Sequence, residues 1–176
     1  MADISGFRAS VVNGLVRPNS FRVELDFPAF VTGGAAAVGL GTFHCKAAQL
    51  PASNVNPIPV FYQGRSINVA GERTFDPWTV VVYNENFLVR DALTRWSHGI
   101  NNIDNNTGVI QPALYQKDLV VKQLSRNGDV LKSIKLIDAM PIQVSPIELD
   151  FENNAQVEIF TCTFVYNYFT ESNVNA

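Results

Sequence analysis

The sequence predicts a mainly β protein, an antiparallel β-barrel or sandwich with one flanking α-helix. Most of the chain alternates apolar and polar residues with a period of two, which is typical of strands that bury one face. Only one segment, 85–98, has apolar residues at helical spacing instead. The length of 176 residues suits one domain and no internal repeat is present, so we expect a single domain over 1–176.

Three strands are predicted in the N-terminal half of the chain. In 21–27, apolar residues alternate with Arg22, Glu24 and Asp26. Alternation returns in 43–47, which includes His44, and in 78–83. Because successive side chains of a strand point to opposite faces, each segment would bury one face and leave the other polar.

The C-terminal half predicts a hairpin, a short strand and a long central strand. Segments 118–124 and 130–136 flank Asn127-Gly128, a pair suited to the positive φ angles of a tight turn. Segment 147–152 alternates apolar residues with acids. Segment 156–169 is the longest and is apolar on both faces, so we expect it to run through the middle of the structure.

The helix predicted over 85–98 has both an apolar stripe and suitable ends. Asn84 is a good N-cap residue, and Asp91 can pair with Arg95 one turn later. His98-Gly99 supplies a cation and a glycine at the C-terminal end. The stripe consists of Leu88, Val89, Ala92, Leu93 and Trp96. We expect this face to cover the end or side of the β structure.

The remaining segments are predicted to be irregular. Residues 1–16 form an N-terminal arm, and 32–41 and 61–77 form extended loops. The first of these loops is rich in glycine and alanine, and the second in glycine and charge. Shorter loops are expected at 53–59, which contains two prolines, and at 101–108, which is rich in asparagine.

The composition indicates a protein whose surface is largely covered by partners and which does not bind nucleic acid through its phosphates. Charged residues make up only 16%, well below a typical soluble domain, so we expect partners to cover much of the exterior. The net charge of −3 lacks the basic excess that phosphate binding needs. We find no signal peptide and no apolar run long enough for a membrane anchor.

No catalytic, cofactor or metal site is predicted, so we expect no enzyme. His44 and Cys45 are adjacent on a predicted strand, so their side chains would point to opposite faces. His98 ends the predicted helix, where a cation favours the helix dipole. Cys45 and Cys162 fit a reducing compartment as small apolar fillers. Spacings typical of zinc sites, phosphate loops and nucleophile elbows do not occur.

Two groups of charged residues remain as candidates for other roles. Glu148 and Asp150, with Glu152, would lie about 7 Å apart on one face of a strand. Such an acidic row is more typical of a solvated surface than of acid–base chemistry. In the loop 61–77, the acids Glu72 and Asp76 could pair with Arg65 or Arg73 and so order the loop.

Residues 58–84, which read IPVFYQGRSINVAGERTFDPWTVVVYN, resemble the tail tube proteins of contractile-tailed bacteriophages. The resemblance continues in 17–23 and 43–51, in a helix with a tryptophan near its end, and in the closing Asp150-Phe151 and long strand. It implies a barrel-like sandwich whose six copies form a ring. Rings would stack into a tube inside a sheath, and strands from all subunits would line a channel for DNA. The implied partners are further copies, the sheath, the baseplate hub and the tail terminator, in a virion tail assembled in the host cytoplasm.

The resemblance gives the charged candidates specific roles. An acidic bore would repel the duplex, so we expect Glu24 and Asp26, or Glu148 and Asp150, to face the lumen. Arg65, Glu72, Arg73 and Asp76 are expected at the contacts between subunits or rings. A type VI secretion tube ring, a tail hub or completion protein with the same barrel, and a monomeric ligand-binding barrel are the alternatives.

Overall fold

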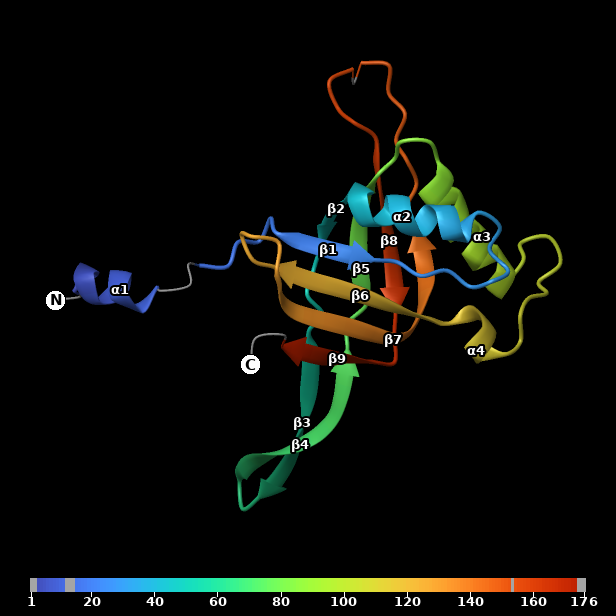
Figure 1. Ribbon diagram of the computed structural model, residues 1–176. Coiled ribbons are helices and arrows are strands. Elements are labelled where there is room, and N and C mark those ends of the chain that lie inside the picture. Colours follow the sequence, from blue (N-terminus) through green and yellow to red (C-terminus); the bar gives the residue numbers. More distant parts are fainter. Residues whose placement is uncertain (1–2, 12–14, 153, 174–176) are drawn as a thin grey trace.

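The structure, a computed structural model, describes residues 3–11, 15–152 and 154–173 (Figure 1). Residues 1–2 and 12–14 of the predicted arm 1–16 lie outside the described residues. The elements in chain order are α1 (Ile4–Ser10), β1 (Phe21–Glu24), α2 (Gly34–His44), β2 (Cys45–Ala48), β3 (Ser53–Tyr62), β4 (Arg65–Phe75), β5 (Trp78–Tyr83), α3 (Leu88–Ile100), α4 (Pro112–Tyr115), β6 (Lys117–Leu124), β7 (Val130–Val144), β8 (Ile159–Val165) and β9 (Tyr168–Asn173). The predicted mainly β, antiparallel class is confirmed.

Two antiparallel layers share the long strand β7. Its first half pairs with β6 and β9, and β6 also pairs with β1. Its second half pairs with β8, which continues through β5 to β2. Between the halves, Asp138 has a φ of 56°, so β7 turns there from one layer into the other. Figure 1 shows β1, β6, β7 and β9 lying across β5 and β8.

The core lies between these layers and under α2 and α3. Trp96 of α3 is fully buried and packs edge-on against Phe27, with ring centroids 5.7 Å apart, and at 6.0 Å from Phe164. Its indole Nε1 donates to the carbonyl of Tyr115 at 2.7 Å. The indole of Trp78 donates in the same way to the carbonyl of Gln49 at 2.6 Å. Each buried tryptophan therefore fills the core while satisfying its one donor.

The helical part of the structure differs from the prediction in number and in bounds. Helix α3 begins at Leu88 rather than 85 and ends at Ile100 rather than 98. Asn84 and Asn86 cap it through their side-chain oxygens, which accept from the N–H groups of Phe87 and Leu88 at 3.2 Å each. The predicted pair of Asp91 with Arg95 is present at 4.0 Å.

Helix α2 forms where 32–41 was predicted to be an extended loop, and that prediction is wrong. The helix has no apolar stripe because small residues take its inner face. A Cβ on Gly34 would lie 2.9 Å from Cβ of Phe27, and one on Gly41 would lie 3.2 Å from Leu25. The small residues let the helix approach the core closely, and they also hide it from a search for helical periodicity.

The predicted strands also differ at three places. His44 ends α2 instead of lying on a strand, so β2 begins at Cys45. The segment 156–169 is divided into β8 and the edge strand β9. The segment 147–152 forms no strand but belongs to a loop between β7 and β8, so Glu148 and Asp150 do not lie in a row on a sheet face.

Candidate assembly surfaces

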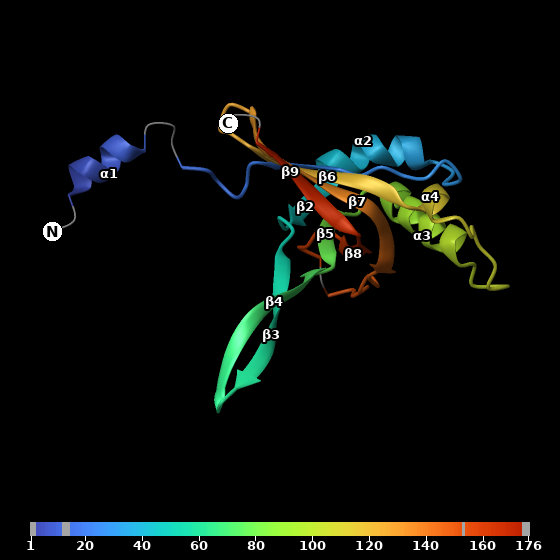
Figure 2. The same ribbon diagram turned by 90° about the horizontal axis from the view of Figure 1, so that it is seen from below.

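The β3–β4 hairpin projects from the body of the molecule as a two-stranded arm (Figures 1 and 2). This corrects the predicted loops at 53–59 and 61–77, since both segments are strands over most of their length. The turn residues Gln63 and Gly64 both have positive φ, 46° and 79°, as a tight two-residue hairpin turn requires. Pro57 and Pro59 are tolerated because each strand of a lone hairpin keeps one free edge.

Most of the hairpin is exposed on both of its faces. One face carries four aliphatic side chains that are about half exposed, and the cross-strand pairs are Ile58 with Val69 and Val60 with Ile67. Phe61 and Tyr62 next to the turn are 77% and 66% exposed. Two strands without a packed face are marginally stable in water, so this arm requires a partner surface.

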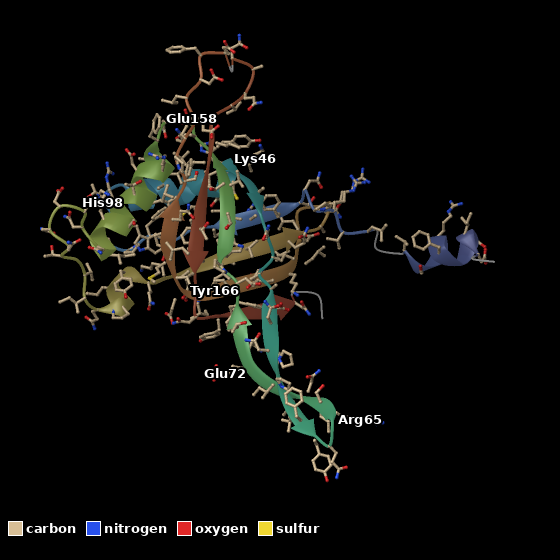
Figure 3. All side chains as sticks on the ribbon, turned by 180° about the vertical axis from the view of Figure 1, so that it is seen from behind. Lys46, Arg65, Glu72, His98, Glu158 and Tyr166 are labelled. Carbon is tan, nitrogen blue, oxygen red and sulfur yellow. The ribbon has the colours of Figure 1, made fainter. Side chains whose placement is uncertain are left out.

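The four charged residues predicted for an interface all belong to the hairpin or its root. Figure 3 shows Arg65 at the tip and Glu72 on the shaft. Arg73 donates to the hydroxyl of Ser53 at 3.1 Å, and Asp76 accepts from the side-chain amide of Asn54 at 2.9 Å. These four side chains form no ion pair with one another among the described residues, so it is hydrogen bonds to β3 that order Arg73 and Asp76.

The hairpin is held to the body by aromatic contacts at its root. Phe75 lies 5.9 Å from Tyr166 and 5.6 Å from Phe169, measured between ring centroids. Burial, with a smaller contribution from the Asp76 carboxylate, raises the pKa of Tyr166. The root is therefore fixed and apolar, whereas the shaft and tip are free to contact another molecule.

A second surface is the polar face of the layer formed by β1, β6, β7 and β9. Here Lys122 lies 2.6 Å from Glu24, and Lys135 lies 2.6 Å from Asp118. Near the end of β1, Lys117 lies 3.7 Å from Asp26. Glu24 and Asp26 thus face outward as predicted from alternation, but lysines of β6 neutralise them. Sequence reasoning missed these lysines because it could not set the register between β1 and β6.

The pair of Lys135 with Asp118 lies at the bend in β7. Partial burial acts to raise the pKa of Asp118, but hydrogen bonds from Lys135 and from the backbone N–H of Asp138 outweigh it and hold that pKa below its ordinary value. The hydrogen bond to Asp118 correspondingly raises the pKa of Lys135. Asp138 in turn accepts from the side-chain amide of Asn167 at 3.0 Å. Asp118 therefore binds both Lys135 and the backbone N–H of Asp138 at the bend where β7 passes from one layer into the other.

Both sides of this four-stranded layer end in strands with one partner. Within the described residues, β1 pairs only with β6, and β9 pairs only with β7. Most residues of β9 are exposed. Such edges present unpaired N–H and C=O groups, which other strands can complete.

The loop 145–158 holds the remaining pair of predicted lumen residues. Its described residues, 145–152 and 154–158, rise at the end of the molecule opposite the hairpin (Figure 1), and residues 145–151 and 156–159 line an open hollow of about 780 Å³. Glu148 and Asp150 are exposed on it, as are the apolar side chains of Leu149 and Phe151. These acids therefore lie in the loop between β7 and β8 and not on the layer that carries Glu24.

The N-terminal arm adds exposed apolar side chains. In α1, no residue is buried, and Ile4 and Phe7 are 75% and 61% exposed. Leu15 and Val16, which precede β1, are 71% and 60% exposed. A seven-residue helix is too short to be stable alone in water, so α1 also needs a surface to pack against.

The cysteine and histidine side chains, which are the types most suited to catalysis, are not arranged as a catalytic site in the described residues. Burial raises the pKa of Cys45 to about 11 and raises that of Cys162 further, so both thiols stay protonated near neutral pH. His44 lies 3.3 Å from the carboxylate of Glu85. In the part of the chain that the structure describes, no three potential metal ligands gather, and no helix is long and apolar enough to cross a membrane.

Comparisons with known proteins agree with one another. The sequence profile of the family described as "Phage tail tube protein" matches residues 16–172. The chain is 36% identical over 166 residues to tail tube protein gp19 of Enterobacteria phage T4, which covers 92% of this chain and 94% of the relative. It is 27% identical over 172 residues to the tail tube protein of Serratia phage KSP90, with 94% and 95% covered.

A solved structure shows the same fold at low sequence identity. A chain of the sheath–tube complex of the PVC extracellular contractile injection system, in its extended state, has a TM-score of 0.62 with this chain. The two are 12% identical, and the match covers 99% of this chain and 100% of the other. The two chains therefore share a fold at a sequence identity of only 12%.

Proposed function

The chain belongs to the phage tail tube protein family, and from this membership we propose that six copies close into rings that stack into a DNA-conducting tube. Members of this family are structural components of the virion tail, not enzymes. One observation supports the proposal most: in the described residues, the layer of β1, β6, β7 and β9 ends at each side in a strand with one unpaired edge. An edge at both sides lets identical copies continue one sheet around a closed ring.

In this proposal, β9 of one copy lies beside β1 of the next copy. The six four-stranded layers then form one continuous barrel whose inner face is the polar face described above. Ring closure removes all of these edges at once, because a closed barrel has none. The opposite face of the layer stays in the core of each copy, where Val23 and Leu136 are buried.

The lumen of the tube would be lined by acidic side chains whose charge is neutralised by lysines. Glu24 and Asp26 are the lumen residues that fit this arrangement, and Lys122 and Lys117 neutralise them. DNA affinity rises with each cation that is free to bind a phosphate, so lysines held by carboxylates weaken binding. The duplex could then move through the tube without being held.

The hairpin and the arm are proposed to join copies. Arg65, Glu72, Arg73 and Asp76 lie on or at the root of the hairpin, whose exposed aliphatic face needs cover. The tail sheath, baseplate hub and tail terminator are the proposed further partners. A type VI secretion ring and a hub or completion protein remain alternatives, but the 36% identity to a tail tube protein favours the tube.

Sedimentation and negative-stain microscopy of the purified protein test this function. We expect rings of six copies, or tubes of stacked rings, in a buffer of moderate salt. A stable particle of 19.4 kDa at all concentrations would contradict the proposal, since an unpartnered monomer leaves both edges open.

A further inference from the structure

The polar face of the layer formed by β1, β6, β7 and β9 carries an arginine that takes no part in the ion pairs of that face. Arg22 of β1 is exposed and lies on this face, since the next residue, Val23, is buried in the core on the other side. The strand register places Arg22 directly across from Lys122 of β6, which Glu24 already holds at 2.6 Å. Like charges at directly opposed positions are destabilising. Among the residues that the structure describes, Arg22 forms no ion pair, so its guanidinium lacks a counter-charge.

Two more exposed arginines lie at the same end of this layer. The side-chain amide of Gln123 donates to the backbone carbonyls of Arg17 and Ser20, at 2.8 and 2.9 Å, so Arg17 is held beside the end of β6. Arg126 lies in the turn that joins β6 to β7, at the left of Figure 1. Neither arginine belongs to an ion pair within the described ranges. This end of the layer therefore presents three arginines whose charge is not neutralised by a bound carboxylate.

The carboxylates at this end already have other partners. Glu171 of β9 lies 2.7 Å from Lys132, and Glu24 is held by its lysine as described above. Asp129, in the same turn as Arg126, accepts from the hydroxyl of Ser125 at 3.4 Å. One acid without a cation thus stands against three arginines, and the local charge is positive.

Ring closure does not supply the missing counter-charge. In the proposed ring, Arg22 lies at the seam between two copies, because β1 is the edge strand that β9 of the next copy joins. Phe169 of β9 packs against the core, and Glu171 lies on the same face of that strand. The side chains that β9 presents on the polar face all carry hydroxyl groups: Tyr168, Thr170 and Ser172. The strand beside Arg22 therefore offers it no carboxylate, and its guanidinium stays free to bind an anion in the lumen.

We propose that Arg22 contacts the phosphates of the passing DNA duplex, and that Arg17 and Arg126 of the same copy strengthen the positive potential around it. This inference rests on the proposed function, since it names the residues through which the lumen touches DNA. A guanidinium is always charged and donates two parallel hydrogen bonds to phosphate oxygens, so arginine suits this contact better than lysine. Cyclic symmetry repeats the same arginine in every copy at one level of the lumen.

Such contacts guide the duplex without stopping it. Phosphates along DNA are chemically equivalent, so a contact that breaks as the duplex advances is replaced by an identical one, and sequence-independent contacts of this kind let DNA slide. Equal contacts from all copies around the ring attract the duplex from every side and keep it on the axis. The lysines of the same face are held by carboxylates, so the free arginines dominate the attraction.

DNA binding to assembled rings measures this contact. The probe is a short fluorescent DNA duplex, whose anisotropy is followed as salt is raised. Arg22→Gln should weaken binding by about fivefold or more and should lower the slope of log affinity against log salt by about 1 or more. Adding Arg17→Gln and Arg126→Gln should weaken binding further. Arg95→Gln removes the same charge from α3, outside the polar face, and is the matched control that should bind DNA like the unmodified protein.

A blocked duplex tests whether the contact lies inside the ring. Streptavidin on biotin at both ends of the duplex prevents it from threading a ring that has already closed. The duplex blocked at both ends should not bind, whereas a duplex blocked at one end should bind like the free one. Equal binding of all three duplexes would place the DNA contact on the outside of the ring and overturn the inference.

The outcomes separate this inference from the proposed function. If the unmodified protein forms no rings, the proposed function fails. If rings form, but the free duplex does not bind at low salt or binds Arg22→Gln equally well, only the arginine contact fails. If Arg22→Gln raises the concentration needed for ring or tube assembly while its rings bind DNA normally, Arg22 binds a second copy of the chain, and the inference is overturned.

Discussion

The backbone N–H of Asp138 donates to Oδ1 of Asp118, 3.1 Å away, at the point where β7 leaves one layer and enters the other. The left-handed backbone of Asp138 creates the turn, and Asp118 of β6 satisfies the amide that the turn exposes. Lys135 then binds the same carboxylate. One side chain thus connects the layer of β1, β6, β7 and β9, whose polar face is proposed to line the lumen, to the layer that contains β8 and β5.

Removing that side chain should weaken the fold. Asp118→Ala leaves the partly buried N–H of Asp138 without an acceptor, so the free energy of unfolding should fall by about 1–2 kcal/mol. Urea unfolding followed by tryptophan fluorescence measures it. Asp104→Ala removes an exposed carboxylate elsewhere and should change the free energy by less than about 0.5 kcal/mol. Equal stability of both variants would show that Asp118 does not hold the corner.

The same residue should give stability a defined pH dependence. The pKa of Asp118 is lower in the folded protein than its ordinary value of 3.8, so the unfolded chain binds its proton more readily. Its stabilisation is therefore complete well above pH 3.8 and is lost as pH falls through the lowered value. The difference in Tm between the unmodified protein and Asp118→Asn should be largest and nearly constant from pH 7 down to about pH 5, and should shrink as the pH falls through and below 3.8. A constant difference down to pH 2 would contradict the assigned pKa shift.

Gly71 should control the curvature of the hairpin. A Cβ at this position would lie 2.5 Å from the carbonyl oxygen of Asn56, at the bulge where the β3–β4 register shifts. Gly71→Ala should therefore distort the hairpin and impair tube growth, while the Tm of the body stays within a few degrees. Gly39→Ala is the control, because a Cβ on Gly39 meets nothing within 4 Å and alanine favours a helix. Normal tubes from Gly71→Ala would show that the bulge tolerates a side chain.

The two native cysteines should be poor nucleophiles. Burial raises the pKa of Cys45 to about 11, and Cys162 is wholly buried in the core. At pH 8, thiolate is therefore scarce at Cys45, so alkylation of the folded protein should be far slower than that of a free thiol. Mass spectrometry after iodoacetamide treatment measures the rate at each site, with unfolded protein as the reference. Rapid labelling of Cys162 in the folded state would mean that the core opens at β8.

Charge in the proposed bore should set the rate of DNA passage. Replacing both Glu24 and Asp26 with lysine removes the partners of Lys122 and Lys117 and adds two cations. Tubes should still assemble, but genome delivery should slow because the freed cations bind phosphates. Asp104→Lys makes the same change of charge per residue in an exposed loop and should not slow delivery. Delivery at the ordinary rate from the double variant would reject a lumen position for these acids.

The sequence allowed the strands with one buried face to be predicted well. β5 matches the predicted 78–83 in both bounds, and β6 and the start of β7 are off by no more than a residue. Their alternation comes from burial of one face within the chain, which is visible locally. The apolar stripe of α3 was visible for the same reason, although its start was misplaced by three residues.

The errors lie where the structure depends on contacts that sequence patterns do not show. Small residues fit α2 closely to Phe27 and Leu25, and this leaves no apolar stripe. The hairpin is exposed on both faces in a single copy, so its sequence does not show the alternation of a strand that buries one face. Its prolines are typical of a loop, and they therefore favoured the wrong prediction. The apolar and acidic alternation at 147–152 resembles a strand but belongs to a loop with an exposed apolar surface.

Hydrogen exchange before and after ring assembly tests the central claim most directly, because it reports pairing of each strand edge. Amides of β1 and β9 should become protected on assembly, while those of β5, which already pairs on both sides, should not change. Protection of β1 and β9 together would support a sheet continued from copy to copy. Unchanged exchange of both edge strands in assembled rings would contradict it.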